Sequence, residues 1–284
     1  MVAAMRDVRT SDSPALPDLP SPVDAAVARY DVLGTQVGAT SEGPEGTPAI
    51  LMVHGVPGST RDYRYLAPLL SRTLRVHRLD LPGYGAVRDA QWHDYSPDGR
   101  ARLVVGVADA LGLEEFAVVG HSMGGPAAIA TAAMVPHRVT ALIVLASVGV
   151  RRHRGMALSP AQAGVLRWAA GLPGVGRALL PKSRKIYRRM GFPNADTLTT
   201  RELRIDLANV MAIDFFAARR RAAAVRAPTL VAWAEDDRLV EPEIGQRLAV
   251  VIPDAETAAY PAGGHNIQKT RARELSEQIT ALVG

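Results

Sequence analysis

A serine stands in the motif Gly120-His121-Ser122-Met123-Gly124, after an apolar run (EFAVV) and before a helix-like one (PAAIATAAMV). A nucleophile at this place lies on a tight turn from strand to helix, and small residues two before and two after it let the chain pass close to itself. The amino end of the helix then directs backbone N–H groups at an oxyanion that develops on an attacked carbonyl. The motif is short enough to arise by chance. The prediction that Ser122 is a nucleophile therefore depends on the position of the motif between a strand and a helix.

A serine hydroxyl is a weak nucleophile at neutral pH and needs a base that a third group orients. The late part of the chain provides both, because Asp237 follows the apolar run TLVAWA and His265 follows the strand-like ETAAY. We therefore predict Ser122 as the nucleophile, His265 as the base and Asp237 as the orienting acid. Asp236 and Glu235, next to Asp237, are the alternative acids.

Short apolar runs alternate with longer amphipathic stretches, which predicts an α/β fold with a mostly parallel, doubly wound sheet. An edge hairpin over Arg29–Gly43, turning near Gly34, precedes these elements. The expected strands are Ala49–Val53, Leu74–Leu79, Phe116–Val119, Val139–Leu145, Thr229–Ala234 and Glu256–Tyr260. The expected helices are Asp62–Ser71, Pro97–Leu111, Met123–Val135, Pro242–Val251 and Thr270–Val283.

With its nucleophile, acid and base in that order, the sequence resembles the α/β-hydrolase family from about Tyr30 to the C-terminus. Two further motifs support the resemblance. The loop His54-Gly55-Val56-Pro57-Gly58 follows the strand AILMV and is similar to the family's HG-x-PG loop. The run Asp80-Leu81-Pro82-Gly83-Tyr84-Gly85 follows the next strand and is similar to the family's D-x-PG-x-G turn.

The resemblance implies roles for the residues around Ser122. The backbone amides of Val56 and Met123 would form the oxyanion hole. His54 would pack beneath the oxyanion loop, and His121 would orient or pack beside the nucleophile. Gly55, Gly120 and Gly124 would support the close approach of these loops. Asp80 is interpreted as a residue that caps its turn rather than as a catalyst.

The resemblance also narrows the chemistry. Haloalkane dehalogenases and epoxide hydrolases of this fold need a carboxylate at the elbow, where this chain has Ser122. We therefore predict a carboxylic-ester hydrolase that works through an acyl-enzyme without a cofactor on a small ester or acyl substrate. Hydrolysis of C–C bonds in diketone acids and cofactor-free perhydrolase activity stay open on the same residues, as does a non-catalytic binding protein.

Residues 148–226 interrupt the alternating pattern and differ in composition. They hold 16 Lys and Arg against four Asp and Glu, although the whole chain has a net charge of +5. Helices are expected at Pro160–Ala170 and Leu198–Ala218, with no strand, so we predict a helical cap inserted into a core of residues 29–147 and 227–284. Its charge is typical either of a solvated face or of a surface that attracts anionic substrates or an anionic membrane. Its aromatic residues would line an acyl pocket or form the cap's own core: Trp168, Tyr187, Phe192, Phe215 and Phe216.

The composition excludes several other classes. The chain has no cysteine, so a disulfide framework, a thiolate nucleophile and a cysteine zinc site are ruled out. No histidine and carboxylate cluster has metal-ligand spacing, no phosphate-binding glycine loop occurs, and nucleic-acid binding is not expected. No apolar run reaches the roughly 18 residues of a membrane-spanning helix.

Residues 1–28 are interpreted as a flexible tail without a secretory signal, and a cytoplasmic location is expected. The oligomeric state stays open.

Overall fold

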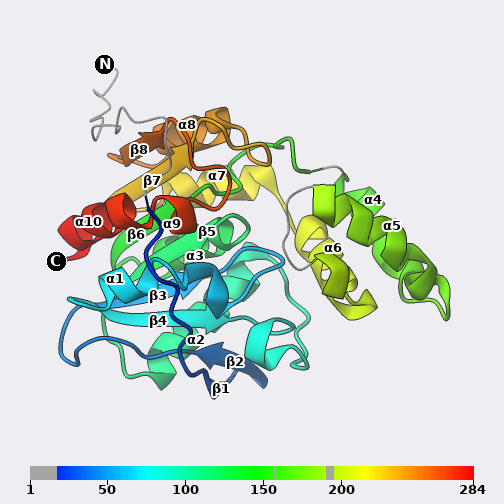
Figure 1. Cartoon of the computed structure of the whole chain (residues 1–284), viewed down its shortest axis with the longest axis horizontal. Coiled ribbons are helices and arrows are strands. Elements are labelled where there is room, and N and C mark those ends of the chain that lie inside the picture. Colours follow the sequence, from blue (N-terminus) through cyan, green and yellow to red (C-terminus); the bar gives the residue numbers. More distant parts are fainter. Residues whose placement is uncertain (1–17, 157, 190–194) are drawn as a thin grey trace.

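The computed structural model of the protein describes residues 18–156, 158–189 and 195–284. Eight strands form one sheet in the order β1-β2-β4-β3-β5-β6-β7-β8 (Figure 1). The sheet is antiparallel from β1 to β4 and parallel from β4 to β8. Its strands are β1 (Ala28–Val32), β2 (Thr35–Ala39), β3 (Ala49–Val53), β4 (Arg75–Asp80), β5 (Phe116–His121), β6 (Val139–Leu145), β7 (Thr229–Ala234) and β8 (Glu256–Tyr260).

Helices cover both faces of the sheet, as the fully apolar central strands require. In β3, Leu51 and Val53 face one apolar cluster, whereas Ile50 and Met52 face the other. The first cluster includes residues of α2 (Pro97–Ala110), α3 (Gly124–Met134), α7 (Phe215–Ala223) and α8 (Pro242–Val251). The second includes residues of α1 (Ala67–Leu70), α9 (Ile267–Thr270) and α10 (Ala272–Val283). The predicted doubly wound α/β fold is confirmed.

The six predicted strands are confirmed to within two residues at each end. The edge hairpin is confirmed as well, but its second strand ends at Ala39, four residues before the predicted end at Gly43. The helix predicted over Asp62–Ser71 is wrong, because this segment folds as a 3₁₀ turn at Thr60–Tyr63 followed by the single-turn helix α1. Pro68 explains the break. It has no backbone N–H to continue a helix that began at Asp62, whereas it is tolerated in the first turn of α1.

The described residues between β6 and β7 fold into helices whose boundaries differ from the expected ones. The described helices are α4 (Pro160–Ala169), α5 (Val175–Arg189), α6 (Thr200–Met211) and α7. The single helix expected over Leu198–Ala218 is wrong, because the chain turns between α6 and α7. At that turn the Asp214 side chain accepts hydrogen bonds from the amides of Phe216 and Ala217, at 2.9 and 3.1 Å, and so caps a new helix. Helix α5 was not predicted.

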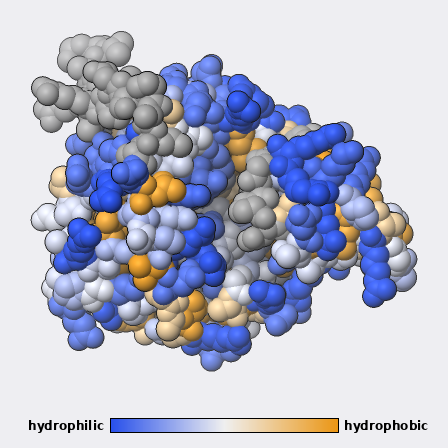
Figure 2. Space-filling model, viewed as in Figure 1, coloured by the Kyte–Doolittle hydropathy of each residue, from blue (hydrophilic) through white to orange (hydrophobic). Residues whose placement is uncertain are grey.

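Only part of the insertion projects from the sheet. Helices α4, α5 and α6 lie to one side of it (Figure 1) and share a small apolar cluster of Ala163, Leu198, Leu203 and Leu207. Helix α7 instead contacts α3 and α8, and Ala222 is buried in the main core. We therefore use "cap" below for α4–α6 alone. Hydrophilic residues predominate on the cap face seen in Figure 2.

Residues 18–27, at the end of the predicted tail, lie along the domain without helix or strand. The Val23 amide donates to the Arg64 carbonyl at 2.8 Å, and the Val23 carbonyl accepts from Arg78 at 3.1 Å. The rest of the predicted tail, residues 1–17, lies outside the described residues. Within the described ranges, none of the helices has the length and apolar character needed to cross a membrane.

Candidate active site

Ser122 lies at the turn between β5 and α3 with a backbone φ of +53°. This left-handed conformation is costly for a residue with a side chain and is typical of functional turns. The turn is tight because the chain passes close to itself. A Cβ on Gly120 would lie 2.5 Å from the Gly124 carbonyl oxygen, and one on Gly124 would lie 2.2 Å from the Val53 carbonyl oxygen. Both positions therefore require glycine.

The structure brings the three predicted catalytic side chains together from the ends of β5, β7 and β8. His265 Nε2 lies 2.9 Å from Ser122 Oγ, and His265 Nδ1 lies 2.8 Å from Asp237 Oδ2. An ionised carboxylate only accepts hydrogen bonds, so Nδ1 carries the proton and Nε2 is left to accept from the serine hydroxyl. This is the arrangement in which a serine can be deprotonated as it attacks.

The environment of Asp237 keeps its carboxyl group ionised. The residue is 2% exposed, and burial alone would raise its pKa. The hydrogen bond and charge interaction with His265, together with amides of Val240 and Leu239 that donate at 3.0 and 2.7 Å, outweigh burial and lower the pKa. Asp237 therefore faces His265 Nδ1 as an anion.

The two alternative acids occupy other places. Asp236 Oδ1 accepts hydrogen bonds from the Gly263 and Gly264 amides at 2.8 and 2.7 Å, so it holds the loop that leads to His265. Glu235 accepts from the Trp233 indole at 2.9 Å. This supporting role of Asp236 was missed by the sequence analysis, although the acid run Glu235–Asp237 offered a signal for it.

His121 precedes Ser122 in the chain and contacts His265. Its Nε2 is 2.9 Å from the His265 carbonyl oxygen, which can only accept, so Nε2 carries the proton. Gln268 approaches the other ring nitrogen at 3.4 Å. Burial, together with the nearby His265, lowers the pKa of His121 to about 3 and keeps it neutral. His121 thus donates a hydrogen bond to the backbone of His265, and no pattern in the sequence pointed to Gln268.

The HGVPG loop lies directly against the nucleophile. A Cβ on Gly55 would be 3.1 Å from the Ser122 Cβ. His54 is fully buried, its Nε2 accepts from the Leu81 amide at 3.1 Å, and its Nδ1 donates to the Gly55 carbonyl at 2.6 Å. Burial lowers the pKa of His54, so this neutral ring ties the loop to the turn after β4.

Asp80 supports the same region as a turn cap. Its carboxylate accepts from the amides of Thr60 and Ala86 at 2.7 and 2.8 Å and is 1% exposed. A Cβ on Gly85 would meet this carboxylate at 2.2 Å, which explains the second glycine of the turn.

The predicted pocket aromatics do not form one lining. Trp168 on α4 is 68% exposed and Phe216 on α7 is 73% exposed, while Phe215 is half-buried. Tyr187 on α5 donates to Asp206 of α6 at 2.7 Å. No ring contact joins these side chains within the part of the chain that the structure describes, and Phe192 lies outside it.

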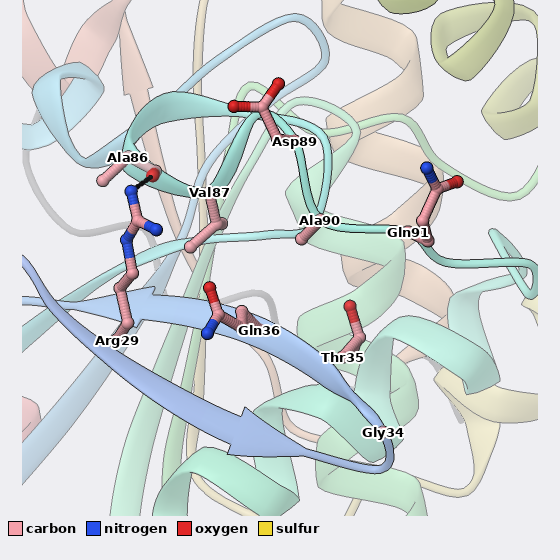
Figure 3. Close-up of a pocket in the computed structure, with 9 residues that line it drawn as sticks. All are labelled: Arg29, Gly34, Thr35, Gln36, Ala86, Val87, Asp89, Ala90 and Gln91. Atoms are coloured by element: carbon pink, nitrogen blue, oxygen red, sulfur yellow. Dashed lines mark hydrogen bonds between the residues drawn. The ribbon is translucent and has the colours of Figure 1, made fainter.

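A pocket of about 300 Å³ lies away from Ser122. It is formed by the β1–β2 hairpin and the loop after η2 (Gly85–Val87), where Arg29 donates to the Ala86 carbonyl at 2.8 Å (Figure 3). None of its lining residues belongs to the predicted site. Across residues 18–156, 158–189 and 195–284, no group of three or more histidines and carboxylates could hold a metal ion.

Part of the positive charge of residues 148–226 is structural. Arg201 donates to the Ala90 carbonyl at 2.7 Å, Arg184 donates to the Leu198 carbonyl at 2.8 Å, and Arg221 pairs with Asp98 at 2.5 Å. Five of the exposed basic residues lie on α5: Arg177, Lys182, Lys185, Arg188 and Arg189. The others lie outside α5: Arg152, Arg154, Arg204, Arg219, Arg220 and Arg226.

The fold and the serine, histidine and aspartate at the carboxyl edge of its sheet define a hydrolase of the α/β class. The chain belongs to the alpha/beta hydrolase fold family, which matches residues 48–272. It is 28% identical over 259 residues to a 2-hydroxy-6-oxononadienedioate/2-hydroxy-6-oxononatrienedioate hydrolase of Cupriavidus pinatubonensis, covering 84% of this chain and 88% of the relative. An uncharacterised hydrolase of Bacillus subtilis is 26% identical over 274 residues, with 90% and 97% coverage. The solved enol-lactonase of Burkholderia xenovorans superposes with a TM-score of 0.71 at 20% identity, covering 90% and 99% of the two chains.

Proposed function

We propose that this hydrolase cleaves a carboxylic ester through an acyl-enzyme on Ser122. The observation that supports this most directly is the continuous hydrogen-bond chain from Ser122 through His265 to Asp237. It is the arrangement that turns a hydroxyl into a nucleophile at neutral pH. A lactone is an ester within a ring, so the same chemistry includes lactones.

In the proposed reaction, His265 Nε2 takes the hydroxyl proton as Ser122 Oγ attacks the ester carbonyl. The Val56 and Met123 amides donate hydrogen bonds to the oxyanion. His265 then gives its proton to the leaving alcohol, and the acyl group stays on the serine. Water attacks the acyl-enzyme with His265 again as the base, which releases the acid and restores the hydroxyl.

A second candidate is hydrolysis of a C–C bond in a diketone acid. It is favoured by the relative from Cupriavidus pinatubonensis, whose name gives a substrate with two carboxylates and a keto group. The exposed basic residues of α5 would attract such an anion from solution by long-range electrostatics. Both candidates need Ser122, so the substrate and not the nucleophile separates them.

The first experiment is hydrolysis of p-nitrophenyl esters from acetyl to palmitoyl by the wild-type protein, with Ser122→Ala as the matched blank. Ser122-dependent release of p-nitrophenol supports the esterase, and the preferred chain length gives the depth of the acyl pocket. We expect Ser122→Ala to lose at least about 10³-fold in kcat/KM, because only binding and the oxyanion hole remain.

A 2-hydroxy-6-oxo dienoic acid, whose colour is lost on cleavage, is measured beside the esters. Faster turnover of this acid than of every ester would replace the esterase by the C–C hydrolase. Equal rates for the wild-type protein and Ser122→Ala on all substrates would contradict both.

A further inference from the structure

An arginine is buried beneath the candidate active site. Arg100 lies on α2 and is 3% exposed, and none of the described carboxylates lies within ion-pairing distance of it. Its Nε has no hydrogen-bond partner among the described residues. Burial lowers the pKa of Arg100 to about 10, so the side chain is still a cation at neutral pH. A buried cation without a counter-ion costs stability, which makes its contacts informative.

Two of its nitrogens donate to different parts of the molecule. Nη2 donates to the carbonyl oxygen of Met123, the residue after the nucleophile. Nη1 donates to Asn209 Oδ1 on cap helix α6, at 2.8 Å. One guanidinium therefore joins the nucleophile turn to the cap.

The cap side of this contact is itself fixed. Asn209 Nδ2 donates to the Ile205 carbonyl at 2.9 Å and lies 3.4 Å from the Tyr84 hydroxyl. That hydroxyl donates to Asp206 Oδ1 at 2.8 Å. Arg100 thus bonds to an amide that α6 and the turn after β4 hold in one orientation.

The Met123 carbonyl is a consequential partner. The Met123 N–H is one of the two proposed oxyanion donors, and the two peptide groups share the Met123 Cα. A displacement of the Met123–Gly124 peptide that carries the Met123 Cα with it therefore also moves the N–H. A misplacement of about 1 Å in a catalytic group can reduce a rate by roughly 100-fold.

We propose that Arg100 is a positioning residue for the oxyanion hole, and that it transmits the position of α6 to the hole through Asn209. This rests on the proposed function, because the hole matters only if Ser122 attacks a carbonyl. Arg100 itself does not touch the substrate. When α6 is in place, this contact keeps the Met123 N–H directed at the oxyanion.

The test compares Arg100→Met with a control of the same type and burial. Arg78 lies on β4, outside the site, and is 1% exposed. It is paired with Glu42 at 2.6 Å. Arg78→Met therefore removes a buried arginine without touching the Met123 peptide. Competent sites are counted by titrating Ser122 with a p-nitrophenyl phosphonate, and kcat and KM are measured per titrated site on the preferred p-nitrophenyl ester.

We expect Arg100→Met to lower kcat about 10–100-fold with KM changed less than about threefold, since a misdirected donor acts on the transition state. Arg100→Lys, which reaches one of the two acceptors, should recover part of the loss. Asn209→Ala should lower kcat about 3–10-fold and add nothing to Arg100→Met, because both act along one chain of contacts. Arg78→Met should keep the wild-type kcat per site.

Arg100→Met with the wild-type kcat per site would overturn the proposal and leave Arg100 a structural residue. If that variant does not fold, Asn209→Ala decides, and an unchanged kcat there overturns the proposal as well. Absence of both Ser122-dependent turnover and phosphonate labelling in the wild-type protein is the separate failure of the proposed function, and the inference falls with it.

Discussion

The nucleophile edge of the sheet and the contact between cap and core are built in different ways. Ser122, Asp237 and His265 each follow a strand, and parallel strands present their carboxyl ends at one edge, so the backbone itself brings them together. The cap is joined to the core by side chains instead. Tyr84 donates to Asp206 at 2.8 Å, and Arg201 donates to the Ala90 carbonyl at 2.7 Å.

This difference separates what is rigid from what can be released. Displacing the triad would require the sheet to shift, and the sheet holds the largest apolar core of the protein. Displacing α6 requires that a few hydrogen bonds, each of which contributes about 1 kcal/mol net, exchange with water and that Ile205 leaves the edge of the main core. The site is therefore fixed on its core side and adjustable on its cap side.

The largest expected effect lies on the core side. Asp237→Asn should lower kcat/KM about 10³–10⁴-fold while the protein stays folded, because an amide facing His265 Nδ1 favours the wrong tautomer. The measurement is ester hydrolysis together with the thermal midpoint Tm.

Asp236→Asn is the matched control one residue away. Its amide oxygen can still accept from the Gly263 and Gly264 amides, so the loss should stay below about tenfold. Equal losses in the two variants would contradict the assignment of Asp237 as the acid.

The same contrast explains what the sequence predicted. Strands such as Ala49–Val53 and Thr229–Ala234 are local apolar runs, and the residues after them follow the topology, so the fold and the meeting of Ser122, Asp237 and His265 needed no long-range information. The choice among three adjacent acids followed from the family resemblance.

The cap could not be predicted to the same depth. Its contacts join residues far apart in sequence, such as Arg100 with Asn209 and Tyr84 with Asp206, and no periodicity encodes such pairs. Helix α5 was missed because Pro181 and the glycines before it are typical of a loop. The break between α6 and α7 depends on the cap formed by Asp214, which a continuous helical pattern concealed.

An intermediate effect is expected at Asp206, where the cap meets the core. Burial raises the pKa of this carboxyl to about 7, against the hydrogen bonds from Tyr187 and Tyr84 that lower it. The folded protein then holds a proton that the unfolded chain releases near pH 4, so this group makes stability fall as pH rises from about 4 to 7. Asp206→Asn removes that slope.

The measurement is Tm between pH 5.5 and 7.0 for both proteins. The wild-type protein should lose up to about 2 kcal/mol more than the variant over this range, or roughly 4 °C. Comparing the two cancels the other titrating groups, including Asp62, whose pKa burial also raises to about 7. Identical pH slopes would show that Asp206 is ionised in the folded protein.

The smallest effect is expected where α7 meets the core. Arg221 of α7 forms a two-pronged pair with Asp98 of α2, at 2.6 and 2.5 Å, and the two side chains are 20% and 40% exposed. Arg221→Met should cost about 0.5–1 kcal/mol, or roughly 2–4 °C in Tm, with kcat unchanged. The cap pair Arg188–Asp196, at 3.6 Å and 58% and 72% exposed, is the control, and Arg188→Met should leave Tm unchanged. A core helix outside the site alters stability without altering turnover per folded molecule. A lower kcat in Arg221→Met would therefore mean that α7 affects the site in the way proposed for the cap.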